Sequence, residues 1–457
     1  MSPTPVALPR RRDSIAPEAR APGSAHLHPF RSAVGHHVLV PDGSRIYDID
    51  AALYDEFQSI IDADGDLMPR LRELGLQSNN AIVGGAGPIP PVRYLSLAVA
   101  QRCNLGCSYC YADGGDFGGE PRSMEYEVGR KTVDRLLDDC TAGERIGIAF
   151  LGGEPLANRN VLHALTRYTA AEATARDVTA TFSVTTNATL ITERDIDLFD
   201  EFAFAVTVSM DGVGEVHDRL RPTRNGGGSY DRIIRAITPM LARQRRLQVS
   251  ARATVTPDNL DLLSTLTTFL DMGFHSVGFA PALATPTGAG ELATADLDRL
   301  LSALIECSDE FVRRLDRGER FAFSNLTSAL QLIHAGAHRP FPCGAGAAYL
   351  GVDADGGFSA CHRFVGSEKG RMGDAVSGWD DSTRLDWLTT RHVDRQEPCQ
   401  SCWARYLCGG GCHHEVLAQG RRSCDFIRSW LEHCVGVYVE VGERHPDWFA
   451  RSDLIVR

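Results

Sequence analysis

Short apolar runs alternate with amphipathic stretches through the middle of this chain. Six runs have strand length, and several stretches between them carry apolar residues at helical spacing. Buried strands separated by helices indicate parallel pairing with crossover helices, in a doubly wound sheet or an incomplete barrel. The predicted strands are 94–100, 146–151, 180–186, 203–209, 247–255 and 276–282, and the predicted helices are 125–140, 158–175 and 231–246.

The flanking regions have different patterns. Residues 1–27 are rich in Pro, Ala and Arg and are expected to be disordered. Residues 28–86 are predicted to form a small α+β module, with strands at 36–43 and 45–50 around a Pro-Asp-Gly turn and helices at 51–63 and 67–75. A long amphipathic helix is predicted at 296–318, with Cys307 in its core face.

Composition limits the possible roles. A chain of 457 residues exceeds what one core usually serves, so two or three domains are expected. The net charge of −12 argues against nucleic acid as a partner. Because we find no signal-peptide pattern and no membrane-length apolar run, we expect a cytoplasmic protein without membrane contact. In a reducing compartment, the 13 cysteines are expected to be metal ligands or core residues.

One loop carries three cysteines at CxxxCxxC spacing directly after the first of the six strands. Cys103, Cys107 and Cys110 can hold three irons of a four-iron cluster and leave the fourth iron open, with Tyr109 beside it. The alternative is a structural zinc site. Zinc requires a fourth protein ligand nearby, and the sequence has no Cys or His between Cys110 and Cys140.

The second of these strands ends in Gly152, Gly153, Glu154 and Pro155. CxxxCxxC followed at this distance by a strand and GGEP resembles the radical S-adenosylmethionine (SAM) enzymes. The resemblance implies a partial (β/α)6 barrel, a SAM bound through its amino and carboxylate groups to the open iron, and its reductive cleavage to a 5′-deoxyadenosyl radical that abstracts a substrate hydrogen. It also implies that GGEP binds the SAM ammonium group and that Tyr109 lies near the adenine.

Further SAM contacts are implied at the next strand ends. The segment 185–190 is similar to the family's TNG(T)L, with Ala188 in place of the common Gly, and Asn187 is a weaker candidate for SAM contact. Ser209 and Arg221 are our candidates for the SAM carboxylate. Asp211, in the same SMDG segment as Ser209, either joins them or organises its own loop. The strand at 276–282 is expected to line the adenine pocket.

A second group of cysteines begins at residue 343. It contains a Gx4C motif from Gly356 to Cys361 and a CxxCx5CxxxC motif, and it resembles the SPASM domain of peptide-modifying radical SAM enzymes. The resemblance implies two auxiliary [4Fe–4S] clusters, three clusters in all; a zinc ribbon is the alternative. One auxiliary cluster is assigned to Cys343, Cys361 and Cys412, and the other to Cys399, Cys402, Cys408 and Cys424.

The first auxiliary set is one ligand short. Sulfatase-maturating relatives have an additional cysteine near the position of Cys343, which this chain lacks, so an iron is open to a substrate thiolate. Cys434 is the other possible ligand, although we favour a core role for it and a structural role for His413 and His414. After Cys361 the chain has no Asp of the kind that serves as a base in sulfatase maturases, and we name no general base.

The segment from Cys361 to Gly366 instead resembles the CH(R/Q)FVG run of thioether-forming maturases of quinohemoprotein amine dehydrogenase and of ranthipeptides. We therefore expect a radical SAM oxidoreductase that forms a thioether crosslink in a ribosomally made peptide, with residues 93–318 as barrel and 319–457 as SPASM domain. The alternatives are C–C or C–heteroatom crosslinking, formylglycine formation in sulfatases, and a non-catalytic zinc protein.

Residues 28–86 resemble leader-recognition modules that bind a precursor by strand addition, or else they only pack on the barrel. A flavodoxin or ferredoxin is the expected electron donor.

Overall fold

The computed structural model describes residues 26–41, 45–76, 88–336 and 338–450. Most of the segment predicted to be disordered, and the Asp and Gly of the predicted turn, therefore lie outside the described residues. Within them, no helix combines the length and the apolar character needed to cross a membrane.

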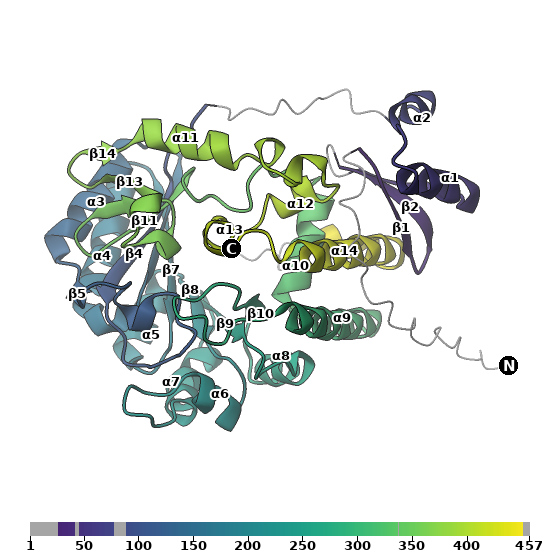
Figure 1. Ribbon diagram of the computed structural model, residues 1–457. Helices are drawn as coiled ribbons and strands as arrows, with labels where there is room; N and C mark the ends of the chain where they lie inside the picture. The colour runs from purple at the N-terminus through teal and green to yellow at the C-terminus, as the bar shows by residue number, and fades with distance from the viewer. Residues whose placement is uncertain (1–25, 42–44, 77–87, 337, 451–457) are drawn as a thin grey trace.

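The six predicted strands form one continuous part of an 11-stranded sheet, from its β10 edge to β4 (Figure 1). They lie side by side in chain order and pair in parallel, with the other strands at one margin. These six strands are β4 (Tyr94–Gln101), β6 (Arg145–Gly152), β7 (Thr179–Thr186), β8 (Ala205–Ser209), β9 (Gln248–Val255) and β10 (Ser276–Pro281). The sheet does not close, because β10 ends it on one side and β11 continues it past β4. The prediction of an incomplete α/β barrel is confirmed.

Helices cover the outside of this sheet, and their apolar faces form the main core with the outward residues of the strands. They are α3 (Tyr126–Asp138), α4 (Arg159–Ala175), α5 (Glu193–Glu201), α6 (Glu215–Leu220), α7 (Tyr230–Ala242), α8 (Leu262–Asp271), α9 (Thr294–Asp316) and α10 (Ser324–His334). The predicted helices at 125–140, 158–175, 231–246 and 296–318 correspond to α3, α4, α7 and α9 within a few residues.

The C-terminal region extends the barrel sheet. Its first strand, β11 (Tyr349–Val352), pairs in parallel with β4, and antiparallel strands follow. These strands are β12 (Gly357–Ser359), β13 (Arg371–Asp374) and β14 (Gly378–Trp379); a short β5 (Arg122–Ser123) also pairs with β4. The helices are α11 (Asp381–Arg391), α12 (Arg405–Cys408), α13 (His413–Gln419) and α14 (Cys424–Arg444).

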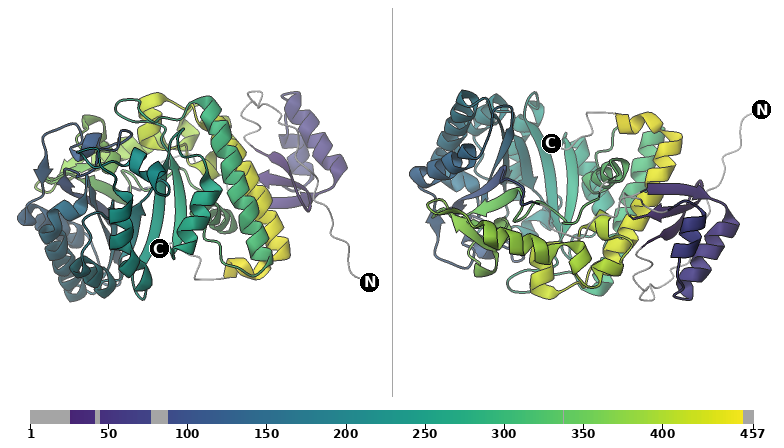
Figure 2. Two further views of the ribbon diagram at one scale, coloured as in Figure 1. Left: turned by 90° about the horizontal axis from the view of Figure 1, so that it is seen from below. Right: turned by 90° about the horizontal axis from the view of Figure 1, so that it is seen from above.

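The N-terminal module is a three-stranded antiparallel sheet with two helices, α1 (Ala51–Asp62) and α2 (Met68–Glu73). The sequence predicted β2 (Gly35–Val40) and β3 (Arg45–Ile49) but not β1 (His28–Ser32). The module packs on the C-terminal region rather than on the barrel: the His28 ring stacks on Trp403 with centroids 3.8 Å apart, and β1 contacts α14. Figure 2 shows α9 and α14 running alongside each other between this module and the barrel.

Candidate functional site

The carboxyl ends of β4, β6, β7 and β8 bring together the loops that the sequence singled out. Parallel strands end at the same edge of a sheet, where barrel enzymes place their active sites. The loop after β4 carries Cys103, Cys107 and Cys110. The thiol of Cys103 is close to Glu154 and Cys110, whose charges add to the effect of burial and raise its pKa.

Cys107 is the most strongly perturbed thiol of this loop. Burial raises its pKa to about 12, the Arg221 guanidinium opposes that shift, and the neighbouring Cys110 and Cys103 add to it. Neighbouring thiols such as these suit a metal centre, because metal coordination deprotonates a thiol and neutralises the crowded charge. The loop thus fits an iron–sulfur cluster.

The GGEP segment supports the cluster loop through backbone packing. A Cβ on Gly153 would lie 2.4 Å from the carbonyl oxygen of Arg102, and one on Gly152, whose φ is +147°, would lie 2.3 Å from that of Ala100. The Gly153 N–H donates to Ala100 O at 2.8 Å, and the Glu154 N–H donates to Arg102 O at 2.9 Å. The two glycines are therefore required for the close approach of β6 to the chain that enters the cluster loop.

Glu154 lies at the centre of a closed hydrogen-bond network. Its buried carboxylate accepts from Thr186 Oγ1 at 2.7 Å, from the Asn187 N–H at 2.8 Å and from the Leu156 N–H at 3.1 Å. Burial raises its pKa to about 7 despite these bonds. The side chain joins the ends of β6 and β7, so any contribution of GGEP to a ligand comes from its backbone or from the remaining acceptor capacity of this carboxylate.

Asn187 continues this network to the cysteine loop. Its Nδ2 donates to Asn104 Oδ1 at 3.0 Å and lies 3.6 Å from Cys103 Sγ, while its Oδ1 accepts from Thr189 Oγ1 at 2.6 Å. N–H groups directed at ligand sulfurs adjust the potential of iron–sulfur clusters. The structure therefore gives Asn187 a supporting position beside Cys103.

Asp211 organises the neighbouring loop. Its fully buried carboxylate accepts from the Tyr109 hydroxyl, from Arg221 Nε at 2.8 Å and from the Thr254 N–H at 2.7 Å. The Arg221 guanidinium also lies 5.6 Å from the Tyr109 ring centroid. Arg221 and Tyr109 are thus held in one network next to Cys107, whereas Ser209 at the end of β8 pairs in register with Arg252 of β9.

The first auxiliary set of cysteines is also brought together. The pKa of Cys361 is raised to about 12, mainly by burial and further by the nearby thiolates of Cys343 and Cys412. Arg363 lies at this group: its Nη1 is 3.7 Å from Cys412 Sγ and donates to Glu415 Oε1 at 2.6 Å. A cation beside three thiolates offsets part of their charge.

The second auxiliary set gathers separately. The pKa of Cys399 is raised to about 12, mainly by burial and further by the charges of the other three thiols of the set, which are Cys402, Cys408 and Cys424. No three His, Cys, Asp or Glu side chains in the described part of the chain surround a single point where one metal ion would sit. In a cluster each thiolate binds its own iron, so its ligands can remain farther apart.

Arg339 joins the two auxiliary sets. Its guanidinium donates to the carbonyl oxygens of Pro342, at 3.4 Å, and Leu407, the residues immediately before Cys343 and Cys408. The backbone fits closely here, because a Cβ on Gly409, whose φ is +73°, would lie 2.4 Å from the Phe341 carbonyl group. The sequence pattern gave no signal for Arg339, since its role depends on two loops meeting.

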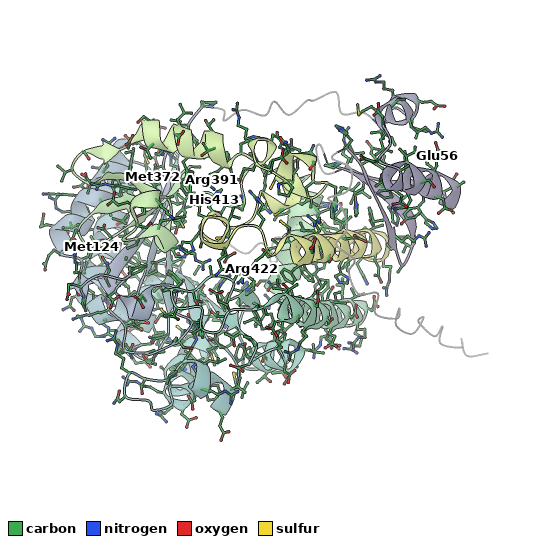
Figure 3. All side chains as sticks on the ribbon, in the orientation of Figure 1. Glu56, Met124, Met372, Arg391, His413 and Arg422 are labelled. Carbon is green, nitrogen blue, oxygen red and sulfur yellow. The ribbon has the colours of Figure 1, made fainter. Side chains whose placement is uncertain are left out.

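Three remaining candidates occupy structural environments. Cys434 is fully buried in the main core, and burial alone raises its pKa. His413, near Arg391 in the centre of Figure 3, packs on the Trp387 ring at 5.4 Å, and the His414 ring packs on Phe364 at 5.2 Å. Each histidine has one buried ring nitrogen without a hydrogen-bond partner among the described residues.

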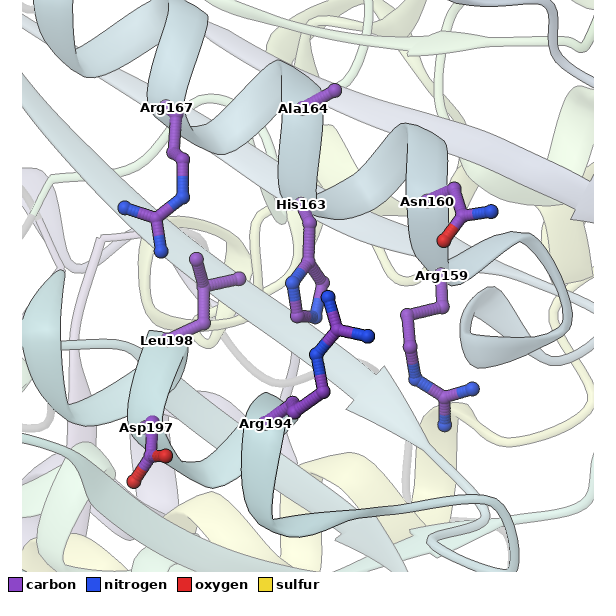
Figure 4. Close-up of a pocket in the computed structure, with 8 residues that line it drawn as sticks. All are labelled: Arg159, Asn160, His163, Ala164, Arg167, Arg194, Asp197 and Leu198. Atoms are coloured by element: carbon purple, nitrogen blue, oxygen red, sulfur yellow. The ribbon is translucent and has the colours of Figure 1, made fainter.

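A surface pocket lies outside this region, between α4 and α5 (Figure 4). Its lining includes Arg159, His163 and Arg194 but no cysteine. Asp195, below it, accepts from Arg159 and His163, and these hydrogen bonds outweigh burial and lower its pKa to about 2. The pocket belongs to the outer helical layer and does not reach the thiol groups.

Comparisons with known proteins agree with this geometry. Residues 97–261 match the family model of the Radical SAM superfamily. An uncharacterized protein of Archaeoglobus fulgidus is 27% identical over 74% of this chain and 79% of its own length. The serine-type anaerobic sulfatase-maturating enzyme of Klebsiella aerogenes is 23% identical over 72% of this chain and 82% of its own length.

Solved structures show the same fold. Native anSMEcpe with bound AdoMet superposes with a TM-score of 0.65 at 20% identity, over 78% of this chain and 100% of that one. The same enzyme is also solved with AdoMet and the Cp18Cys peptide. SuiB of Streptococcus suis gives a TM-score of 0.50 at 15% identity, over 88% of this chain and 97% of that one.

The family match decides between cluster chemistry and a non-catalytic zinc protein at the first cysteine loop. A radical SAM domain binds a [4Fe–4S] cluster and SAM, and the thiols at the mouth of the barrel fit that cluster. Residues 97–261 therefore form a radical SAM domain of an enzyme, and the chain has a fold similar to that of anSMEcpe.

Proposed function

We propose that this enzyme modifies a ribosomally made peptide or small protein and closes an intramolecular thioether crosslink between a Cys sulfur and a carbon. The observation that carries the proposal is the group of Cys343, Cys361 and Cys412, three thiols close together with the guanidinium of Arg363 beside them. Three ligands leave one iron of a four-iron cluster for another thiolate, and a peptide Cys is a suitable one.

The chain's own residues would hold the cofactors at the barrel mouth. Cys103, Cys107 and Cys110 would ligate the first cluster, and SAM would contact Tyr109, the GGEP residues 152–155, Asn187, Ser209 and Arg221. When bound, this pair supplies reductive cleavage of SAM and hydrogen abstraction from the substrate. The Asp211 network fixes Tyr109 and Arg221 before any ligand arrives, so little side-chain entropy is lost on binding.

Two further clusters are part of the proposal, on residues 319–457. Cys399, Cys402, Cys408 and Cys424 would ligate a complete one, and Cys343, Cys361 and Cys412 the one with an open iron. A flavodoxin or ferredoxin would donate electrons. The bond from Arg339 to both cysteine segments supports the idea that the two auxiliary sites act as one unit.

Residues 28–86 would bind the leader of the precursor. β3 is at the edge of the small sheet, so a peptide strand can add to its backbone groups. Phe30 and Leu39 of this sheet belong to the main core, and β1 contacts α14 of the C-terminal region. A strand bound at β3 would therefore be held in a constant position relative to the cysteine sites.

Formylglycine formation in a sulfatase is one alternative, because the curated relatives include serine-type and cysteine-type sulfatase-maturating enzymes. C–C or C–heteroatom crosslinking, in which auxiliary clusters only accept electrons, is the closer alternative to the thioether. The absence of a carboxylate in the segment from His362 to Gly366 favours crosslinking over formylglycine formation.

The test is anaerobic incubation of the reconstituted enzyme with SAM, a reductant and the precursor encoded beside its gene. Loss of two hydrogens with one peptide thiol protected from alkylation supports the thioether. Loss of two hydrogens with every thiol still free would exclude it and favour another crosslink. Conversion of a Ser or Cys to an aldehyde would establish formylglycine formation.

A further inference from the structure

The loop that joins β10 to α9, residues 282–293, packs on the barrel mouth. Its Gly290, whose φ is +70°, is so close that a Cβ there would lie 3.2 Å from Tyr109 Cβ and 3.3 Å from Thr256 Cγ2. Thr256 belongs to the same network as Tyr109, because Asn259 accepts from the Thr256 N–H at 2.7 Å and donates to the Asp211 carbonyl oxygen at 2.9 Å. One side of this loop therefore supports the residue proposed to lie near the SAM adenine.

Glu291, the residue after Gly290, holds the other side of the loop. Its side chain is only 14% exposed, and its Oε1 accepts from the Thr285 N–H at 2.7 Å, which closes the loop on itself. Both carboxylate oxygens also accept from Gln419 Nε2 at 2.8 Å, and Oε2 accepts from Arg422 Nη2 at 3.2 Å. Hydrogen bonds to an ionised acceptor are roughly twice as strong as neutral ones, so this carboxylate attaches the loop to the C-terminal region.

The two donors come from the segment between the auxiliary cysteine groups. Gln419 is the last residue of α13, which begins immediately after Cys412, and Arg422 lies two residues before Cys424. The Arg422 guanidinium also donates to the carbonyl oxygen of Leu283, in the same loop. One short loop therefore contacts the proposed SAM site on one side and the segment between the proposed auxiliary ligands on the other.

We propose that Glu291 is a positioning residue for SAM: its carboxylate fixes the loop against Tyr109, and the affinity for SAM depends on its bonds to the segment 412–424. A site whose walls are fixed before the ligand arrives loses less conformational entropy on binding. Because such coupling is reciprocal, SAM in turn stabilises this segment of the auxiliary region. The inference rests on the proposed place of SAM beside Tyr109 and does not depend on which bond the enzyme forms.

The test is calorimetric titration of SAM into the anaerobic, reconstituted holoenzyme with its clusters oxidised, so that SAM is not cleaved. E291Q keeps the size of the side chain but not its charge, and it should weaken SAM binding about 5- to 10-fold, toward the lower end of couplings between sites. Q419L changes a residue of the auxiliary segment and should also weaken SAM binding. E291Q/Q419L should lose less than the product of the two single factors, because both side chains act through one contact.

The matched control is E310Q. Glu310 has a similar exposure, 12%, and pairs with Arg314 at 2.7 Å on α9, the helix that follows the loop. Its replacement removes a carboxylate of the same burial that has no bond to the loop among the described residues, so the Kd for SAM should equal that of the wild type.

Other outcomes contradict the inference in distinguishable ways. Unchanged SAM affinity in E291Q at wild-type iron content overturns it. Weaker binding in E291Q with the wild-type Kd in Q419L also overturns it, and limits Glu291 to its own loop. Loss of iron in both variants overturns it as well, because weaker binding would then follow from the missing clusters. A wild-type enzyme that alters no precursor mass, while the variants bind SAM more weakly as expected, contradicts the proposed function alone.

Discussion

The rings of Tyr111 and His362 meet edge-on with their centroids 5.5 Å apart. Tyr111 follows Cys110 in the first cysteine loop, and His362 follows Cys361 in the auxiliary group. The Arg363 guanidinium also lies 5.6 Å from the centroid of the Tyr111 ring. The two cysteine groups are therefore joined by a direct side-chain contact between the residues next to their ligands.

This contact predicts the effect of changing Tyr111. Tyr111→Ala removes the ring contacts to His362 and Phe117 and should lower the free energy of unfolding by about 2 kcal/mol. Tyr111→Phe keeps the ring and should remain within about 0.5 kcal/mol of the wild type. Anaerobic urea unfolding measures both. Equal losses in the two variants would mean that the hydroxyl, not the ring, is what stabilises the loop.

Arg339 contacts both auxiliary cysteine segments, so we expect that its replacement affects both sites together. Arg339→Met removes the bonds to the Pro342 and Leu407 carbonyl groups and a positive charge near Cys408 and Cys343. Three four-iron clusters correspond to about 12 irons per chain, and we expect this variant to fall toward about 4 while retaining the barrel cluster.

The control for Arg339 is Arg313→Met. The Arg313 side chain is 58% exposed and pairs with Glu310 on the same helix. The iron content of Arg313→Met should therefore equal that of the wild type. Electron paramagnetic resonance of the reduced Arg339 variant should show signals lost from both auxiliary sites together. Loss of one signal only would contradict the linkage of the two segments through this side chain.

The backbone conformation of Ala188 indicates that a glycine at this position would stabilise the protein. Its φ is +61°, in the left-handed region that costs a non-Gly residue about 1 kcal/mol or more. Ala188→Gly removes this strain and should raise the free energy of unfolding by about 0.5–1 kcal/mol. Ala251→Gly, in the middle of β9, should lower it by at least as much. Destabilisation by both changes to the same extent would contradict the strain at Ala188.

The burial of His433 leads us to expect that the free energy of unfolding depends on pH. Burial between α14 and α9 lowers its pKa to about 4, and its Nε2 lies 2.8 Å from Ser308 Oγ. Because the unfolded chain takes up this proton near pH 6.5 and the folded chain does not, its contribution is fully present above pH 6.5 and is lost as the pH falls toward 4.

Urea unfolding between pH 7 and 4.5 tests this linkage. The wild type should lose about 2 kcal/mol more than His433→Gln over this range, since glutamine carries no titratable proton. Parallel curves for the wild type and His433→Gln would contradict the prediction.

The sequence predicted those parts of the fold whose patterns are local. The barrel strands and the helices around them follow from apolar runs and helical spacing within each segment. β1, with the sequence HPFRS, has no such pattern and is a strand because β2 pairs with it and α14 covers it. The strands β12 to β14 have two to four residues each and depend on their neighbours for pairing.

The candidate site also has parts that the sequence predicts and parts that depend on how separate segments meet. Cysteine spacing identified the first group, because Cys103, Cys107 and Cys110 are close along the chain. The two auxiliary groups, whose members come from separate segments, were assigned only through the resemblance to the SPASM domain. The pairing of Arg221 with Asp211 and the contacts of Arg339 required coordinates, since each depends on the way separate loops meet.

Substitution of Cys434 tests how many protein ligands the first auxiliary group has. If Cys434 is a core residue, as its position in the apolar interior indicates, Cys434→Ser buries a hydroxyl and lowers the free energy of unfolding by about 1–3 kcal/mol while the iron content stays at its wild-type value. Cys412→Ser, in contrast, should lose one cluster, about 4 irons. His413→Phe and His414→Phe test the remaining possibilities, because each ring has a buried nitrogen without a partner among the described residues. Iron and sulfide analysis of the four anaerobically purified variants decides between them: loss of iron only in Cys412→Ser leaves the group with three protein ligands, and loss in Cys434→Ser, His413→Phe or His414→Phe identifies the fourth.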